Sequence, residues 1–246
     1  IAYQAVLGGR RISIGGMAKG SGMIHPSMAT MLSYLTCDVG IDHVLWSDMI
    51  KRVAESSFNS ITVDGDTSTN DTFLAFASGA ELDPRYLSIL EEGLHLTAQH
   101  LAKAIARDGE GANCLLEIKV EGASSDLDAR VIARTIASSS LVKTAVHGSD
   151  PNWGRIIAAL GRAGIFFNIN DVKLWIGPYE IFSNGTPQEF DKQIVSNFMK
   201  ARLKGKYLID DLISIRLSLG IGKGSAMAWG CDLSDQYVRI NADYTT

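Results

Sequence analysis

Apolar side chains recur at helical spacing in four stretches of the chain. In residues 44–57 they stand at positions 44, 45, 49, 50, 53 and 54, so they would line one side of a helix. Residues 86–106 show the same helical spacing over a longer stretch, which predicts a second helix. Gly109 follows this stretch, and glycine commonly ends helices. The pattern predicts two more helices, over residues 126–137, which an aspartate opens, and over residues 190–203.

Strand-like runs lie between and around these helices. Residues 114–120, 173–176, 213–219 and 237–242 are predicted strands, and three of them alternate apolar and polar positions. Residues 31–39 and 60–63 are shorter runs that favour β-structure. Asn184-Gly185 between apolar segments predicts a two-residue hairpin turn. The chain is therefore predicted to be α/β, with a seam near residues 110–114.

Composition narrows the class of protein. With 246 residues, 46% hydrophobic and 20% charged, the chain can bury the core of one or two globular domains. No window of about 18 apolar residues is present, so no membrane span is predicted. A formal net charge of −4 argues against a nucleic-acid surface and favours small-molecule partners. The three widely spaced cysteines are predicted to be small buried hydrophobes, without disulfide or zinc site.

The segment 19–32 carries the most informative chemistry. It places Ala29 directly before Thr30 in a loop that also contains Lys19, Gly20 and Gly22. If the Ala29–Thr30 bond breaks, Thr30 gains a free α-amine beside its own hydroxyl, and that pairing activates an otherwise weak nucleophile. Ala29 offers little steric hindrance to such an attack. The segment thus predicts a self-cleaving threonine nucleophile.

Other polar loops have an ordinary interpretation beside a functional one. The loop of residues 62–72 holds three aspartates and four threonines. One interpretation is that these residues form turns and cap a helix that begins near Phe73. The other is that they form a hydrogen-bond network that supports a catalytic loop. It lacks the spacing of a calcium loop. Glu110 lies on a turn flanked by glycines, where a carboxylate could bind a substrate ammonium or simply face solvent. His25 is interpreted as a loop-shaping residue, with a base as the alternative.

The remaining loops suggest no cofactor site. Residues 148–155 are typical of capping before an apolar helix. Residues 220–225 match neither phosphate-loop pattern. No metal site is predicted.

Five blocks, taken in order, resemble the ornithine acetyltransferase family, also called the ArgJ or glutamate N-acetyltransferase family. They are residues 19–32, 61–72, 108–112, 141–155 and 228–246. Together they span nearly the whole chain, which makes the resemblance far more specific than any one loop.

The resemblance implies a reaction and a set of site residues. A precursor would cut itself between Ala29 and Thr30, and Thr30 would carry an acetyl group from N-acetylornithine to glutamate in arginine biosynthesis. Acetyl-CoA is left open as a second acetyl donor, and no cofactor is implied. Thr30 would be both catalytic and substrate-binding, and the other substrate-binding residues implied are Lys19, Glu110, Asn241 and Thr246.

The resemblance also implies an architecture. It is a layered α/β sandwich with an N-terminal-nucleophile site of the DmpA/ArgJ type, followed by a smaller α/β domain. Residues 1–29 would be the remnant of an α subunit, residues 30–113 the catalytic core part of the β subunit, and residues 114–246 its C-terminal domain. An α subunit from the same precursor and an α2β2 heterotetramer are the expected partners.

Family precursors carry a long upstream segment with a Thr-Gly oxyanion element. Ile1 is not an initiator methionine, so we expect an N-terminally truncated chain that is inactive or weakly active alone, since losing an oxyanion donor costs on the order of 10²–10³ in rate. A cytoplasmic location is expected, with a plastid or mitochondrion left open. Two alternatives remain: an amidohydrolase or aminopeptidase with the same N-terminal threonine, and an inactive fragment that serves only assembly or binding.

Overall fold

The computed structural model describes residues 1–25 and 31–243. It contains two sheets and seven α-helices within those residues, which confirms the predicted α/β class. The four-stranded sheet has the order β1-β2-β3-β4, and only the β3–β4 pair is parallel. Its strands are β1 (Ala2–Leu7), β2 (Arg10–Lys19), β3 (Leu32–Cys37) and β4 (Thr72–Ala77).

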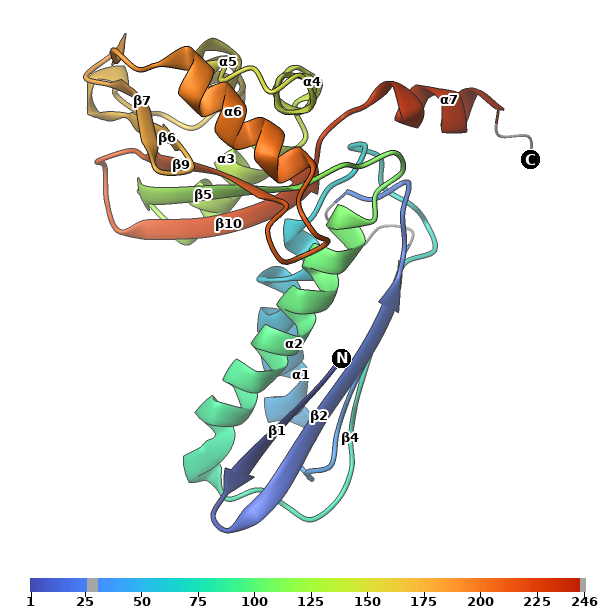
Figure 1. The fold of residues 1–246 in the computed structure, drawn as a ribbon. Helices are drawn as coiled ribbons and strands as arrows, with labels where there is room; N and C mark the ends of the chain where they lie inside the picture. The colour runs from blue at the N-terminus through green and yellow to red at the C-terminus, as the bar shows by residue number, and fades with distance from the viewer. Residues whose placement is uncertain (26–30, 244–246) are drawn as a thin grey trace.

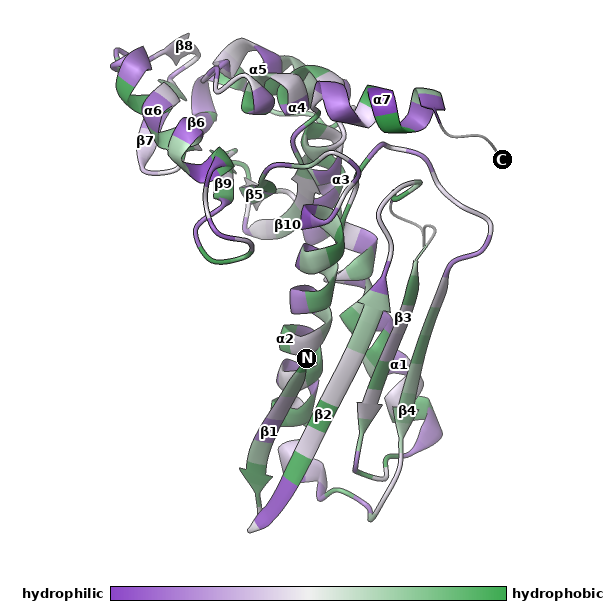
Figure 2. Ribbon diagram, turned by 45° about the vertical axis from the view of Figure 1, so that its right-hand side comes forward, coloured by the Kyte–Doolittle hydropathy of each residue, from purple (hydrophilic) through white to green (hydrophobic). Residues whose placement is uncertain are grey.

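Two helices lie along this sheet (Figures 1 and 2). They are α1 (His43–Glu55) and the long α2 (Leu87–Arg107), with the short 3-10 turns η1 (Phe58–Ser60) and η2 (Pro84–Tyr86) near their ends. Asp42 caps α1 by accepting hydrogen bonds from the backbone of Val44 and Leu45. Fully buried Leu94 and Ala98 on α2 and Leu35 on β3 belong to one apolar core. This core holds the helices against the sheet.

The second sheet has six strands in the order β10-β5-β9-β6-β7-β8, with only β5 and β9 parallel. The strands are β5 (Leu115–Ala123), β6 (Lys173–Ile176), β7 (Tyr179–Ser183), β8 (Thr186–Pro187), β9 (Leu212–Ser218) and β10 (Gly224–Cys231). Its helices are α3 (Asp126–Ala137), α4 (Ser140–His147), α5 (Trp153–Arg162) and α6 (Lys192–Leu203), with the 3-10 turn η3 (Ile169–Asp171). These strands and helices share an apolar core that is separate from that of the first sheet, and together they form the second layer of the molecule.

The two layers meet at the end of β10. Trp229 and Cys231 belong to that strand, yet both are buried in the core of the first layer. An isolated bridge pairs Ile61 with Trp229. The last helix, α7 (Asp235–Asp243), leaves the body of the molecule and has no buried residue (Figure 1). No described helix has the length and apolar character needed to cross a membrane.

Most predicted elements are confirmed. The four expected helices match α1, α2, α3 and α6 to within about two residues, and the runs 31–39, 114–120, 173–176 and 213–219 match β3, β5, β6 and β9. The hairpin at Asn184-Gly185 joins β7 to β8, and both residues have positive φ. The helix expected after residue 152 is α5, capped by Asn152.

Three expectations were wrong. Residues 237–242 form part of α7 and not a strand; this segment leaves the body of the molecule and pairs with no described strand (Figure 1). The helix expected near Phe73 is instead β4, whose residues bond to β3. Residues 60–63 make one isolated bridge and no strand. The strands β1, β2 and β10 were not foreseen.

Candidate active site

The end of β2 and the beginnings of β3 and β4 lie side by side, and the predicted nucleophile directly precedes this end of β3. Leu32, the first residue of β3, pairs with Lys19 on β2 and with Thr72 on β4. Ala29 and Thr30 lie outside the described residues. Met31, which follows Thr30 directly, is 2% exposed. Its backbone N–H donates to Asp71 Oδ1 at 2.8 Å, and its carbonyl accepts from the Thr72 N–H at 3.1 Å. The chain leaving Thr30 is therefore held on both sides.

The loop that precedes Thr30 is held by Asp64. Its carboxylate accepts hydrogen bonds from the backbone N–H groups of Met23 at 2.6 Å and Ile24 at 3.1 Å. The Val63 N–H donates to the Ile24 carbonyl at 2.8 Å. Met23 has a φ of 53°, a conformation uncommon for residues with a side chain. The hydrogen-bond network expected of residues 62–72 is thus present, and it fixes the segments on both sides of the undescribed residues 26–30.

Glu110 joins this loop to the C-terminal helix. Its backbone N–H donates to the Ser21 carbonyl at 3.1 Å, and its carboxylate accepts from Asn241 Nδ2 at 2.7 Å. The turn that carries it requires Gly111, which has a φ of 70° and lies against the backbone of Tyr237. The predicted residues Glu110 and Asn241 are therefore brought together from positions far apart in the sequence. Thr246 lies outside the described residues.

A polar cavity of about 450 Å³ opens beside this loop. Its lining combines the backbone of a Gly-rich loop, one cation and one carboxylate with the apolar side of α2. The lining residues are Ala18, Lys19, Gly20, Ser21, Gly22, Leu101, Ala104, Ile105, Asp108 and Tyr207. A space of this size accommodates a small ligand, and Lys19 supplies a charge that complements a carboxylate. Lys19 thus lies next to the segment that Glu110 contacts.

His25 lies against the loop of residues 62–72. Its Nδ1 lies 3.1 Å from Thr62 Oγ1, and burial, followed by the nearby Arg134 guanidinium, lowers the pKa of the imidazole below its usual value. A neutral ring tied to the 62–72 loop fits the interpretation of His25 as a loop-shaping residue.

Sequence reasoning missed the individual roles of Asp64 and Asp71. Both stand in the polar loop that had been singled out, but the sequence contains no signal that pairs one with residues 23 and 24 and the other with residue 31. Tyr207, which closes one side of the cavity, carried no signal at all.

Gly22 offers a test of the Glu110 position. A Cβ at this residue would come 2.7 Å from the Glu110 carboxyl carbon, whereas its φ does not require glycine. Gly22→Ala is expected to displace the Glu110 carboxylate and to weaken at least about tenfold the binding of a ligand that this carboxylate contacts, as misplacement of a binding group does.

Gly161→Ala is the matched control, since a Cβ there meets nothing within 4 Å and alanine favours a helix by about 1 kcal/mol. Unchanged ligand binding by Gly22→Ala would contradict the placement of Glu110 in the candidate site.

Fold and site together define a layered α/β protein with a polar, ligand-sized cavity at one end of a four-stranded sheet. The chain belongs to the ArgJ family, whose sequence model matches residues 1–246. It is 94% identical over 246 residues to the arginine biosynthesis bifunctional protein ArgJ of Prochlorococcus marinus strain NATL2A, and 62% identical over 245 residues to that of strain MIT 9313. The match covers all of this chain but 59% and 57% of those proteins. The chain thus spans less than two thirds of their length.

A solved structure supports the fold. The crystal structure of the arginine biosynthesis bifunctional protein ArgJ from Bacillus halodurans is 41% identical in sequence and superposes with a TM-score of 0.81. The match covers 87% of this chain and 100% of the other. The layered α/β architecture implied by the resemblance is therefore confirmed.

Proposed function

We propose that the protein containing this chain transfers an acetyl group from N-acetylornithine to glutamate through an acetyl ester on Thr30. The observation that carries the proposal is the meeting of Lys19, Glu110 and the start of β3 at one end of the sheet. Membership of the ArgJ family and relatives named for arginine biosynthesis support it. We further propose the division at residues 29 and 113, an α subunit and α2β2 assembly.

Self-cleavage would begin with attack of the Thr30 hydroxyl on the Ala29 carbonyl. The Oγ–C bond forms as the C–N bond breaks, and the hydroxyl proton passes to the nitrogen. Water then hydrolyses the ester, which restores the hydroxyl and leaves Thr30 with a free α-amine, whose pKa in peptides is about 8.

Transfer would use the same hydroxyl twice. In the first half, Oγ attacks the acetyl carbonyl of N-acetylornithine while its proton passes by way of the α-amine to the leaving nitrogen of ornithine. In the second, the amine of glutamate attacks the ester, its proton returns to Oγ, and N-acetylglutamate leaves. Lys19 would pair with the substrate carboxylate, and Glu110 with Asn241 would bind the amino-acid portion. Acetyl-CoA is proposed as a possible second donor.

Intact-mass spectrometry before and after exposure to N-acetylornithine tests the proposal. The expected result is cleavage after Ala29 and an added acetyl mass on the fragment that begins with Thr30. Formation of N-acetylglutamate on addition of glutamate distinguishes transfer from an amidohydrolase, which would release acetate with or without glutamate. A single uncut and unmodified chain, expressed with any coding sequence that precedes residue 1, would refute the proposal.

A further inference from the structure

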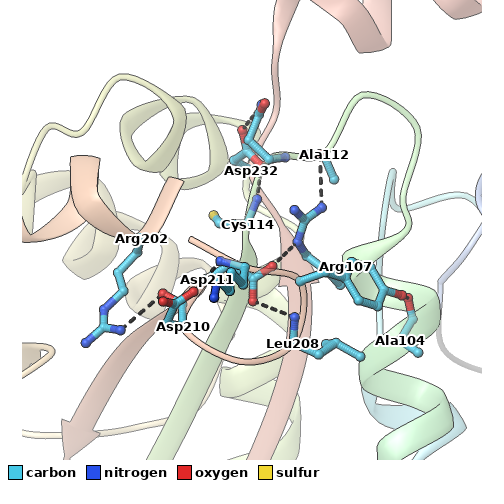
Figure 3. Close-up of polar contacts among 12 residues, drawn as sticks. Ala104, Arg107, Ala112, Cys114, Arg202, Leu208, Asp210, Asp211 and Asp232 are labelled. Atoms are coloured by element: carbon cyan, nitrogen blue, oxygen red, sulfur yellow. Dashed lines mark hydrogen bonds and ion pairs between the residues drawn. The ribbon is translucent and has the colours of Figure 1, made fainter. Parts of the chain in front are cut away.

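Asp232 is a buried carboxylate that does not line the polar cavity but holds residues close to it. The residue is 2% exposed. Its Oδ1 accepts the backbone N–H groups of Asn113 at 2.7 Å and Cys114 at 3.1 Å (Figure 3). Its Oδ2 accepts a hydrogen bond from Asn113 Nδ2 at 2.9 Å and lies 2.8 Å from His147 Nδ1. Hydrogen bonds to a carboxylate are roughly twice as strong as those between neutral groups, so Asp232 fixes residues 113 and 114 firmly.

The contact with Asn113 extends to the turn that carries Glu110. The Asn113 Nδ2 group, which donates to Asp232, also donates to the Gly111 carbonyl at 3.3 Å. Ser234 Oγ donates to the same carbonyl at 2.7 Å. Gly111 follows Glu110 directly in the chain, so these contacts set the position of the Glu110 backbone.

Helix α4 anchors Asp232 and the residue on either side of it. Lys143 Nζ donates to the Cys231 carbonyl at 2.6 Å, and the Lys143 carbonyl accepts the Leu233 N–H at 3.2 Å. His147, which contacts Asp232, lies one turn further along the same helix. Three consecutive residues at the end of β10 are therefore fixed on α4 just before α7 leaves the body of the molecule.

We infer that Asp232 is a positioning residue that holds Glu110 and Asn241 in place for the amino-acid part of the substrate. The inference rests on the proposed function and deepens it, because it names what sets the geometry of the proposed binding pair. Asp232 reaches Glu110 through Asn113, and it stands shortly before α7, whose Asn241 donates to the Glu110 carboxylate at 2.7 Å. Its effect on a ligand passes through these two residues.

The variant Asp232→Asn tests the inference because it changes one oxygen and keeps the shape. The amide oxygen can still accept the backbone N–H groups of Asn113 and Cys114, but an NH₂ group, which cannot accept, replaces Oδ2. His147 can take up this change by presenting the lone pair of a neutral ring nitrogen. The Asn113 amide has to turn its own oxygen toward the new NH₂ group, and it then loses its bond to the Gly111 carbonyl.

Single-turnover acetylation by N-acetylornithine, followed by intact mass, measures the effect in the protein expressed with any coding sequence that precedes residue 1. We expect the half-saturating concentration of N-acetylornithine to rise about tenfold, as misplacement of a binding group does. The limiting rate should stay within about twofold of the wild type, since losing a contact made equally in ground and transition states weakens binding alone. Self-cleavage should remain complete, because the proposed cleavage does not use Glu110.

Coupling to Glu110 is a readout that a merely structural role would not change. In a Glu110→Gln background the contact through which Asp232 acts is already weakened. Adding Asp232→Asn should therefore raise the half-saturating concentration by less than about threefold, because residues that share a partner have non-additive effects.

Two further variants complete the design. Asp42→Asn is the matched control: its Oδ1 also accepts two backbone N–H groups, those of Val44 and Leu45, but it lies beyond the far end of β3 from the site. It should leave binding and rate unchanged. Asn113→Ala keeps the backbone N–H that Asp232 binds and removes only the Nδ2 group, so it should weaken binding in the same way even where Asp232→Asn does not fold.

The outcomes separate the inference from the proposed function. Weaker binding with the limiting rate and cleavage preserved, and with coupling to Glu110, supports the inference. An unchanged half-saturating concentration in Asp232→Asn, or in Asn113→Ala where the first variant does not fold, overturns it and leaves the proposed function intact. An equal rise with and without Glu110→Gln also overturns it. A wild-type protein that neither cuts nor becomes acetylated overturns the proposed function, and this inference with it.

Discussion

Thr30→Ala is expected to abolish both self-cleavage and acetyl transfer. Both proposed steps use the same hydroxyl, and no other nucleophile is proposed to replace it. Loss of a catalytic nucleophile typically costs on the order of 10⁴ to 10⁶ in rate. The purified variant should therefore run as an uncut chain and form no acetyl adduct with N-acetylornithine.

Thr30→Ser supplies the matched control, because it keeps the hydroxyl and, after cleavage, the amine. We expect it to cleave and to transfer at a reduced rate, since without the methyl group the side chain is less restricted. Intact mass and N-acetylglutamate formation measure both steps. Cleavage at Ala29 in Thr30→Ala would contradict the assignment of the nucleophile.

Asp211→Ala is expected to lower the stability of the protein strongly. Asp211 is fully buried, and its carboxylate pairs with Arg107 at the end of α2 and accepts the Leu208 N–H at 3.0 Å (Figure 3). Its carbonyl accepts the Leu115 N–H at the start of β5. Removing one partner of such a pair leaves a largely buried guanidinium unpaired, which costs about 3–5 kcal/mol of unfolding free energy.

The same change should also affect the site. Arg107 donates to the Ala112 carbonyl at 3.1 Å (Figure 3), and the turn between them carries Glu110. We therefore expect Asp211→Ala to raise KM for the proposed amino-acid substrate as well as to lower the urea midpoint of unfolding.

Asp48→Ala is the control for this prediction. Asp48 pairs with Lys51 on the exposed side of α1, and both side chains are more than half exposed. Exposed ion pairs contribute little to stability, so the urea midpoint of unfolding of Asp48→Ala should equal that of the wild type. A loss of less than about 1 kcal/mol in Asp211→Ala would show that the pair does not join α2 to the second sheet.

The buried cysteines illustrate a prediction from residue type alone. Cys37, Cys114 and Cys231 are all buried and free, and burial raises the pKa of each thiol. Cysteine behaves as a small hydrophobe, and the absence of any close spacing in the sequence was enough to predict this environment.

The sequence by itself determined the α/β class, four of the helices and the hairpin at Asn184-Gly185. The physical reason is that helical period, capping and turn chemistry depend on residues close together in the chain. It also indicated the segment around Thr30, because the small residue, the nucleophile and the glycines are neighbours there. Where a local pattern is short and ambiguous, as in residues 237–242, the helix or strand choice depends on whether a strand partner exists.

Only the tertiary structure decided which distant residues meet. The pairing of Glu110 with Asn241, the anchoring of Ile24 by Asp64 and the contact between Met31 and Asp71 each join residues at least 40 positions apart. Strand register and the packing of Trp229 into the first core set these contacts, and neither follows from local periodicity. The sequence thus indicated the proposed nucleophile, whereas the contacts of the carboxylates that hold the segments on either side of it are a product of the fold.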